Sequence, residues 1–501
     1  MRKWLALAIT VCITIPANTQ DIQTYSESRI EYDRLISRIE YARLMSALLE
    51  AEALPYPPQH IIVDDWDFLS ALPEADVIHP PIDPYGGVMP LPEGAQVVGT
   101  PGFFRTAKVD GTWWFVTPDD NLFLSIAVTD VTHHGHSLDG NNPYAEAVTK
   151  KYGDFDSWAE PTLERIRGWG FNSLGPWSSS ELYARGIPYT VIVDVAAHLG
   201  YADSENYVPD YFADDFEAKA DAHIARVVAP YRDDPWLLGF FTDNEAVWGP
   251  DWRTSRTLVQ IYWSMPEDSA GRREVMRFVR EQSETLDHFN ETWGLALSSW
   301  DDLDGLTPED LRVETSDAIA VSDAFTAHVM DRYASVCRKL LDRHAPNHLI
   351  LGCRFHDYLG DAIKLAAARH FDVISLACYW MMPPTDRIGR IAEEADRPFL
   401  IEEFSFRGMD TELPNENFAG PNVPSQYDRA IAYHHFVREF MRHPWAISVH
   451  WYKYFDNPLN APDFGENYGL VDSHDEPYDI LVKMVEAVNS RLYALRLPST
   501  R

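Results

Sequence analysis

Two apolar runs in this chain stop abruptly at carboxylates. The run 237–241 is followed by the polar residues 242–245, and the run 398–401 is followed by Glu402 and Glu403. An unbroken apolar run is typical of a strand that is buried on both faces. Since a carboxylate without a partner is costly inside a core, we expect these acidic side chains where each strand ends and a pocket begins.

The hydrophobic pattern predicts a repeated succession of strand and helix over most of the chain. Strands are expected at 122–131, 171–177, 189–195, 237–245, 349–355, 372–379, 398–404 and 446–454. Helices are expected near 156–168, 179–186, 216–230, 317–345, 361–370, 386–395, 425–442 and 478–495. Eight strand–helix units in sequence predict an α/β fold, specifically a closed (β/α)8 TIM barrel.

Residues 249–315 are predicted to form a helical insertion after the fourth strand. A doubly wound open sheet is the alternative to a barrel. Such a sheet usually carries a Gly-rich phosphate turn after an early strand, and the sequence has none. Ahead of the first strand, 102–117 predicts a β-hairpin around Asp110-Gly111, which we expect as a lid over the N-terminal end of the barrel.

The first part of the chain differs from the rest. Residues 1–20 combine a basic start, an apolar stretch and small residues, which predicts a signal peptide and a secreted or periplasmic protein. Residues 21–101 show helical periodicity over 26–52 and are then Pro-rich, as in an extended covering segment. The barrel is expected over 102–498. No later apolar run is long enough to predict a membrane span.

Composition narrows the classes of function. The chain is 46% hydrophobic and 13% aromatic, which excludes a disordered protein. Its net charge of −35 argues against nucleic acid and strongly anionic polymers as partners. The 16 Trp and 24 Tyr residues suit either stacking on sugar rings or the packing of a large barrel. Cys337, Cys353 and Cys378 lack metal-binding spacing, so we expect three buried thiols and neither a metal nor a cofactor.

The two strand ends that carry glutamate suit one reaction in particular. Double-displacement glycoside hydrolysis needs a proton donor and a nucleophile across a sugar ring, and Glu245 and Glu403 could supply them. Ideal strand geometry places Glu403 inside the barrel and turns Glu402 toward the helices. A bulge or a strand end is needed for both Asn244 and Glu245 to face inward, and Asp243 is then left as a buried carboxylate.

Other predicted strand ends carry polar and aromatic residues that are candidates for contact with a ligand. They are His134, Asn172, Trp177, Arg354, Tyr379, His450 and Trp451. The cluster 133–136 contains three histidines and suits either a metal site or contacts with sugar hydroxyls. We expect Arg354, or a backbone amide, to be the partner of Asp243. Rings and hydrogen-bond donors at so many strand ends favour a carbohydrate cleft.

Several motifs resemble those of a known enzyme family. They are GFFR at 102–105, GTWWFVTP at 111–118, GFFTDNE at 239–245, RPFLIEEF at 397–404, HWYKYFD at 450–456 and GENY at 465–468. Together they resemble the family 50 glycoside hydrolases, the β-agarases of clan A. These agarases usually carry a long N-terminal sugar-binding β-domain, and the segment 21–100 is too short and too helical for one.

The resemblance implies a retaining mechanism with Glu245, preceded by Asn244, as acid/base and Glu403 as nucleophile. It also implies that Tyr379 holds the nucleophile and that Trp451 forms the floor of the sugar site. The charge of Glu403 should help to keep Glu245 protonated.

The expected activity is hydrolysis of β-galactosidic bonds in a red-algal galactan, foremost agarose attacked from its chain ends. The alternatives are a β-galactosidase, a hydrolase of porphyran or carrageenan, and a non-catalytic carbohydrate-binding protein. The excess of acidic over basic residues favours a neutral galactan over a sulfated one.

Overall fold

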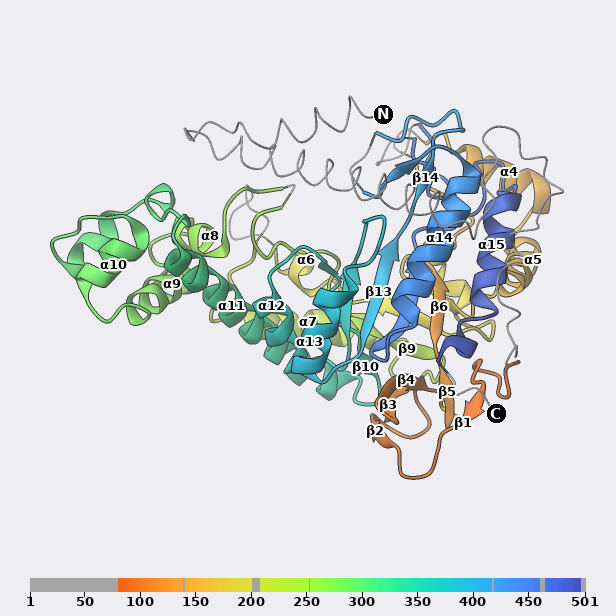
Figure 1. Ribbon diagram of the computed structural model, residues 1–501, viewed down its shortest axis with the longest axis horizontal. Helices are drawn as coiled ribbons and strands as arrows, with labels where there is room; N and C mark the ends of the chain where they lie inside the picture. Colours follow the sequence, from red (N-terminus) through yellow and green to blue (C-terminus); the bar gives the residue numbers. More distant parts are fainter. Residues whose placement is uncertain are drawn as a thin grey trace, which may run out of the picture.

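The computed structural model describes residues 80–137, 140–200, 208–251, 253–416, 419–459 and 465–496. The predicted signal peptide and the predicted helix over 26–52 lie outside these ranges. Within them, the chain is a mixed α/β protein built on one large parallel sheet (Figure 1). No helix in these ranges is long and apolar enough to cross a membrane.

Nine parallel strands form the central sheet, which curls as the wall of a barrel does. In chain order they are β6 (Ser125–Val128), β7 (Ser173–Leu174), β8 (Tyr189–Ile192), β9 (Leu237–Phe241), β10 (Leu349–Ile350), β11 (Phe355–His356), β12 (Ile374–Ala377), β13 (Phe399–Phe404) and β16 (Ala446–Trp451). The order across the sheet is β10-β9-β8-β7-β6-β16-β13-β12-β11. Parallel neighbours bring the carboxyl ends of the strands to one edge, where the polar residues of the strand ends gather.

The strand predicted at 349–355 is split into β10 and β11, the two outermost strands of the sheet. Between them, Gly352 has a φ of +105°, and a Cβ there would lie 2.5 Å from the Ser375 hydroxyl oxygen, so a side chain does not fit. Arg354 follows with a φ of 49°. The segment that holds both strands pairs with β9 at its start and with β12 at its end.

Helices follow most of the strands and cover the sheet (Figure 1). They are α4 (Pro143–Tyr152), α5 (Phe155–Gly168), α6 (Val195–Leu199), α7 (Phe216–Val228), α11 (Ser316–His344), α12 (Asp361–Ala368), α13 (Thr385–Ala395), α14 (Gln426–Met441) and α15 (Asp479–Asn489). The helix expected near 179–186 is only a 3-10 turn, η1 (Ser180–Leu182). Helix α4 is an addition to the predicted set. It begins with Asn142, whose side chain accepts from the Ala145 amide at 3.0 Å, followed by Pro143.

The insertion after β9 forms a helical arm that projects from the sheet. Its helices are α8 (Leu258–Ser264), α9 (Ala270–Glu281) and α10 (Leu286–Trp293), with the 3-10 turns η2 (Trp300–Gly305) and η3 (Pro308–Asp310). Figure 1 shows these helices in green at the far end of α11, which runs back to the sheet. Trp263, Phe289 and Trp293 are buried within the arm, so it has apolar packing of its own.

A small antiparallel sheet lies at the opposite end of the parallel strands. Its order is β1 (Met89–Pro90), β5 (Asn121–Phe123), β4 (Thr112–Val116), β3 (Arg105–Val109) and β2 (Gln96–Val98). The turn of the β3–β4 hairpin, Asp110-Gly111, has positive φ at both residues, as a tight two-residue hairpin requires. The Trp113 amide donates to the Pro444 carbonyl at 2.6 Å, and Lys108 pairs with Asp396 at 2.6 Å. Both partners directly precede parallel strands, so this sheet covers strand starts.

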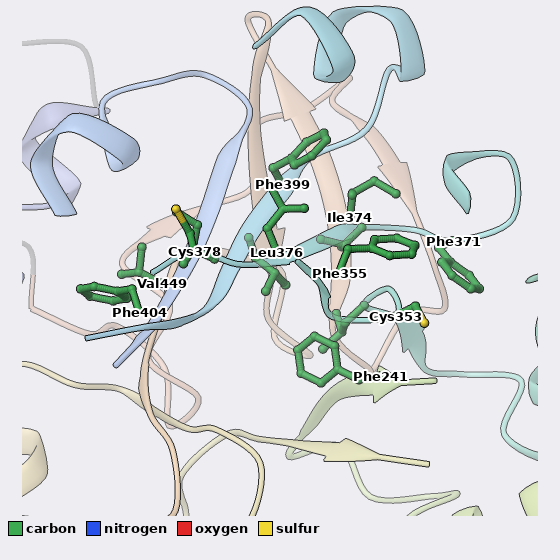
Figure 2. Close-up of a cluster of buried hydrophobic side chains, with 14 of the residues drawn as sticks. Phe241, Cys353, Phe355, Phe371, Ile374, Leu376, Cys378, Phe399, Phe404 and Val449 are labelled. Carbon is green, nitrogen blue, oxygen red and sulfur yellow. The ribbon is translucent and has the colours of Figure 1, made fainter. Parts of the chain in front are cut away.

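Apolar side chains from neighbouring strands fill the space around the sheet. Figure 2 shows one such cluster, which includes Phe241, Cys353 and Cys378. Cys337, Cys353 and Cys378 are all buried free thiols, as the sequence predicts. They act here as small apolar residues of the core.

Candidate active site

Arg354 lies at the centre of the polar groups at the carboxyl ends of the strands. Its guanidinium carbon is 4.7 Å from the Trp177 ring centre and 5.1 Å from that of Phe241. Its Nε donates to Asn244 Oδ1 at 2.7 Å, and its Nη2 donates to Glu403 Oε1. Arg354 was expected to contact substrate, but its side chain is fully buried. It instead joins the end of β9 to the end of β13.

Glu403 is a nearly buried carboxylate held by two donors. Besides Arg354, the Tyr379 hydroxyl donates to Glu403 Oε2 at 2.5 Å. Burial raises the pKa of Glu403 to about 7, while the charge of Arg354 and the hydrogen bond from Tyr379 oppose this rise. Both donors stabilise the ionised form, which is the form that can attack as a nucleophile.

Glu402 does not turn toward the helices as ideal strand geometry predicts. It is fully buried, and its Oε2 lies 2.8 Å from Arg354 Nη2. The cause is an irregularity in β13, because its register against β16 shifts between Ile401 and Phe404. A bulge of this kind breaks the alternation of side chains along a strand. Glu402 and Glu403 therefore both approach Arg354.

Asn244 and Glu245 reach the site together because β9 has already ended at Phe241. The Glu245 amide donates to the Arg354 carbonyl at 3.2 Å, and Glu245 has a φ of 47°. A left-handed backbone costs about 1–2 kcal/mol for a residue other than glycine, so the surrounding structure must impose it. This turn is the strand end that the pair Asn244-Glu245 requires.

Side chains from two other segments surround Glu245. The Arg253 guanidinium donates to the Glu245 carbonyl oxygen at 2.6 Å and is paired with Asp251 at 2.6 Å. His356 Nδ1 lies 3.5 Å from Glu245 Oε1, and the His356 ring stacks on Tyr358 with centres 5.0 Å apart. Glu245 is thus fixed at its backbone by the insertion and approached at its carboxyl by the end of β11.

Burial raises the pKa of Glu245 to about 7, and the charge of Asp251 contributes to the rise. The positive charges of Arg354 and Arg253 oppose it. Desolvation is therefore the main cause of the raised pKa, and not the charge of Glu403 as expected from the sequence. A carboxyl group with this pKa retains a proton near neutrality and can donate it.

Three aromatic side chains stand next to the two glutamates. Trp177 is 42% exposed and its ring centre is 6.1 Å from that of Tyr452, which is 6.4 Å from that of Tyr379. An exposed indole beside hydrogen-bonding groups suits stacking on a sugar ring. Side-chain exposure is 19% at Glu245 and 6% at Glu403, so access to the second carboxylate is narrow.

Asp243 bonds to backbone amides, one of the two kinds of partner expected for it, and not to Arg354. Its Oδ1 accepts from the Ala196 amide at 2.7 Å, at the start of α6, and its Oδ2 accepts from the Tyr333 hydroxyl. Burial raises the pKa of Asp243 to about 8. The side chain ties the end of β9 to α6 and α11, which is a structural task.

The histidines after β6 have separate partners. His134 is exposed, its ring centre is 3.7 Å from that of His133, and its carbonyl accepts from Asn142. His136 bonds to Asp130 at 2.7 Å. In the part of the chain that the structure describes, no three His, Cys, Asp or Glu side chains come together in a way that could hold a metal ion.

Known proteins with similar sequences are agarases. No family model matches the chain. It is 26% identical over 487 residues to β-agarase B of Vibrio sp. (strain JT0107), with 82% of this chain and 50% of that protein covered. The chain is a relative of the β-agarases. β-Agarase A of the same strain is 26% identical over 471 residues, with 79% and 46% covered, so the chain spans about half the length of these curated relatives.

Solved structures share the fold of this β-agarase relative. A structure described as an exo-β-agarase has a TM-score of 0.70 at 23% identity, covering 89% of this chain and 72% of that one. PfGH50B has a TM-score of 0.69 at 23% identity, covering 82% and 70%. The agarase AgWH50C has a TM-score of 0.69 at 21% identity, covering 96% and 72%. The predicted resemblance to the family 50 β-agarases is confirmed.

Three predicted contact residues of this β-agarase relative do not lie at the candidate site as expected: Asn172 is partly buried before β7, and His450 and Trp451 are fully buried. Asn172 precedes β7 instead of ending it, and its side chain accepts from the Ile126 amide at 2.8 Å. Trp451 is fully buried with its ring centre 5.6 Å from that of Tyr433 on α14, so it packs against the helices and is not an exposed floor for a sugar. His450, its neighbour on β16, is fully buried as well.

Three residues belong to the site although the predicted contact set omits them: Tyr452, His356 and Glu402. Alternation along a strand could have identified Tyr452, because a Trp451 that faces the helices turns its neighbour the other way. His356 follows Arg354 by two residues, at the same strand end. Glu402 depends on the bulge in β13, which the sequence does not mark.

Proposed function

We propose that this protein is a secreted, retaining glycoside hydrolase that cleaves the β-galactosidic bonds of agarose or agaro-oligosaccharides. The observation that carries the proposal is the unequal treatment of two carboxyl groups around Arg354. Glu403 accepts hydrogen bonds from Arg354 and Tyr379 that favour its ionised form, whereas His356 Nδ1 lies 3.5 Å from the Glu245 carboxyl. Burial raises the pKa of both acids to about 7, so the donors decide which of the two is ionised. A double displacement needs one carboxylate and one carboxylic acid.

The reaction follows from these two states. Glu403 attacks the anomeric carbon, and Glu245 gives its proton to the departing glycosidic oxygen, so the sugar becomes an ester of Glu403. Glu245, now ionised, then takes a proton from water, which attacks the same carbon and releases Glu403. Retention of configuration requires the two carboxyl groups to lie about 5–5.5 Å apart with the sugar between them.

The substrate class rests on the relatives and on the rings beside the glutamates. Two curated relatives are named β-agarases, and Trp177 and Tyr452 offer faces for an uncharged galactose ring. The small exposed fraction of Glu403 supports attack at a chain end, because a long polymer needs an open groove to reach a buried nucleophile along its length. We assign substrate contacts to Trp177, Tyr452, Asn244 and Tyr379.

We further propose that the curled sheet closes as a (β/α)8 barrel within 102–498. The pairing of β10 with β9 and of β11 with β12 supports closure, because one segment joins both edges. Residues 1–20 then act as a signal peptide for secretion or export to the periplasm, and 21–101 as a covering segment.

Product analysis tests the activity. The protein and its Glu403→Ala variant are incubated with agarose, neoagaro-oligosaccharides, porphyran, carrageenan and an aryl β-galactoside. We expect the wild type alone to release a single short product from agarose from the first minutes, with retained anomeric configuration by NMR. Cleavage of only the aryl galactoside would identify a β-galactosidase instead. Binding without turnover on any substrate would identify a carbohydrate-binding protein.

A further inference from the structure

The group around Arg354 contains more carboxyl groups than cations. Glu402 and Glu403 both lie at Arg354 Nη2, and the Glu245 carboxyl interacts with the same guanidinium charge. Arg354 and Glu402 are fully buried, and Glu403 is nearly so. The charge of Arg253, which also acts on Glu245, is paired with Asp251 at 2.6 Å. One positive charge thus faces three acids in a place where an uncompensated charge is costly.

Neutrality fixes how many of these acids are ionised. With one guanidinium and three carboxyl groups, the cluster is neutral when two of the three acids carry protons. The proposed mechanism requires Glu403 ionised and Glu245 protonated, which leaves the second proton for Glu402. The count holds through the reaction, because Glu245 becomes ionised in the same step in which Glu403 becomes an ester.

The hydrogen-bond donors around each acid indicate the same distribution of protons among the three acids. Glu403 accepts from Tyr379 and Arg354, whereas neither oxygen of Glu402 accepts a hydrogen bond from any residue that the structure describes. An ionised carboxylate without donors is strongly disfavoured in a buried site, and two like charges at one cation raise the pKa of the less favoured member.

Groups on the neighbouring strands do not alter this balance. His450 lies beside the irregular part of β13 on β16, and burial lowers its pKa to about 3, so it is neutral. Cys378, at the end of β12, is buried and its pKa is raised, so it is neutral too. The Asp194 carboxyl also interacts with Arg354, but it belongs to an exposed residue, and desolvation raises its pKa, which disfavours its charged form.

We propose that Glu402 is a positioning residue that stays protonated beside Arg354. The positive charge of Arg354 then stabilises the ionised form of Glu403 without competition from a second carboxylate. An ionised Glu402 would compete for Nη2 and make the ionisation of the nucleophile harder. The inference rests on the proposed function for the roles of Glu245 and Glu403, but the protonation of Glu402 can be measured without turnover.

Infrared difference spectra at neutral pH test the proposal directly. The wild-type spectrum minus that of Glu402→Gln should contain the carbonyl stretch of one protonated carboxylic acid. Glu393→Gln, an exposed glutamate on α13, is the matched control and should remove a carboxylate band instead. Loss of a carboxylate band in the Glu402→Gln difference would overturn the proposal. If Glu402→Gln does not fold, Glu402→Met, which has similar size and no charge, gives the same comparison.

The pH profile of kcat/KM gives a second readout that a purely structural role would not predict. Glutamine imitates the protonated acid, so the acid limb of Glu402→Gln should move by less than about half a pH unit. If Glu402 is ionised in the wild type, its neutralisation should lower that limb by about one unit or more, which contradicts the proposal.

The proposed function can fail separately from this inference. A 2-deoxy-2-fluoro-galactoside with a good leaving group should label the peptide at Glu403. A label at Glu402 would overturn both the assignment of the nucleophile and the positioning role. Absence of turnover on every galactan would reject the proposed function, while the infrared difference would still report the proton on Glu402.

Discussion

Two buried ionic clusters near the carboxyl ends of the strands show opposite balances of charge. At Asp475, one fully buried carboxylate accepts from Arg165 at 2.8 Å, from the Tyr152 hydroxyl at 2.8 Å and from Lys151 at 3.2 Å. At Arg354, a single guanidinium faces three carboxyl groups. At Asp475, several hydrogen-bond donors surround one carboxylate, whereas at Arg354 three carboxyl groups share one guanidinium.

The difference separates a structural cluster from a reactive one. Donors that converge on Asp475 tie α4 and α5 to the segment that leads into α15. Around Arg354, burial raises the pKa of Glu245, and Glu402 accepts no hydrogen bond from the residues that the structure describes. Perturbed acids of this kind are characteristic of catalytic sites.

Loss of Glu403, the acid at Arg354 that accepts two hydrogen bonds, should reduce activity more than any other change. Glu403→Ala cannot form the covalent ester, so kcat should fall by at least about 10⁴-fold on every substrate. Initial rates on agaro-oligosaccharides and on an activated aryl galactoside give the measurement. Glu393→Ala serves as the control and should retain wild-type rates. A Glu403→Ala enzyme within tenfold of wild type on either substrate contradicts its role as nucleophile.

Removal of the proton donor should depend on the leaving group. Glu245→Ala should lose about 10²–10⁴-fold on agaro-oligosaccharides, because the departing sugar oxygen needs a proton. Substrates with very good leaving groups need little protonation, so their first step should be nearly unaffected.

Azide distinguishes this role from a general loss of structure. It can attack the covalent ester without help from a base and should partly restore turnover of the activated substrates by Glu245→Ala. Equal losses on all substrates, with no effect of azide, would show that Glu245 is not the acid/base.

Two isosteric amide substitutions compare the stability of the clusters. Asp475→Asn leaves Arg165 and Lys151 without their shared carboxylate, so the free energy of unfolding should fall by roughly 3 kcal/mol. Glu402→Gln replaces a protonated acid by a neutral amide and should change it by less than about 1 kcal/mol. Urea unfolding of both variants gives the two values. A larger loss for Glu402→Gln than for Asp475→Asn would reverse the distinction between the clusters.

Removal of the hydrogen bond from Tyr379 to Glu403 should shift the pH dependence of kcat/KM. The Tyr379 hydroxyl donates to ionised Glu403 and so lowers the pKa of that carboxyl. Tyr379→Phe removes this stabilisation, the pKa of Glu403 rises, and the acid limb of kcat/KM should move to higher pH with a loss of about 10–100-fold below that limb. Tyr189→Phe, which removes a hydroxyl from Asp234, is the control. A limb that stays in place in Tyr379→Phe contradicts the assignment.

The sequence was informative wherever a residue's position depends on the regular path of a strand. Apolar runs located β9 and β13, and with them Glu245 and Glu403 beyond the carboxyl ends of two strands of the same sheet. Strand alternation then failed at Glu402, because the bulge in β13 depends on the pairing with β16 and leaves no local mark in the sequence. The position of Arg354 likewise depends on the break between β10 and β11.

Aromatic residues were harder to place than carboxylates. A buried carboxylate needs a partner, so its position is constrained, whereas a tryptophan is as well accommodated in a core as in a sugar site. Trp451 lies in the core and Trp177 is exposed, and only the structure distinguishes them. The motif that contains Trp451 was correctly located, but Tyr452 is the residue next to the site.

The smallest expected effect concerns sulfated substrates. Arg354, Lys453 and Arg407 are basic residues at or just after the ends of predicted strands. All three are buried in ion pairs, Lys453 with Asp130 at 2.8 Å and Arg407 with Glu466. A sulfate group would have to compete with these carboxylates.

We therefore predict that kcat/KM is at least several-fold higher on agaro-oligosaccharides than on sulfated galactan oligosaccharides of equal length. Each buried sulfate needs an Arg or Lys partner to offset its desolvation, and the net charge of −35 repels a polyanion over longer distances. Both substrates are compared at low and high salt. Added salt should leave the rate on the neutral substrate unchanged and raise the low rate on the sulfated one, because it screens the repulsion. A sulfated substrate that is hydrolysed faster, at a rate that falls with added salt, would mean that a basic subsite exists and that the acidic surface does not set the preference.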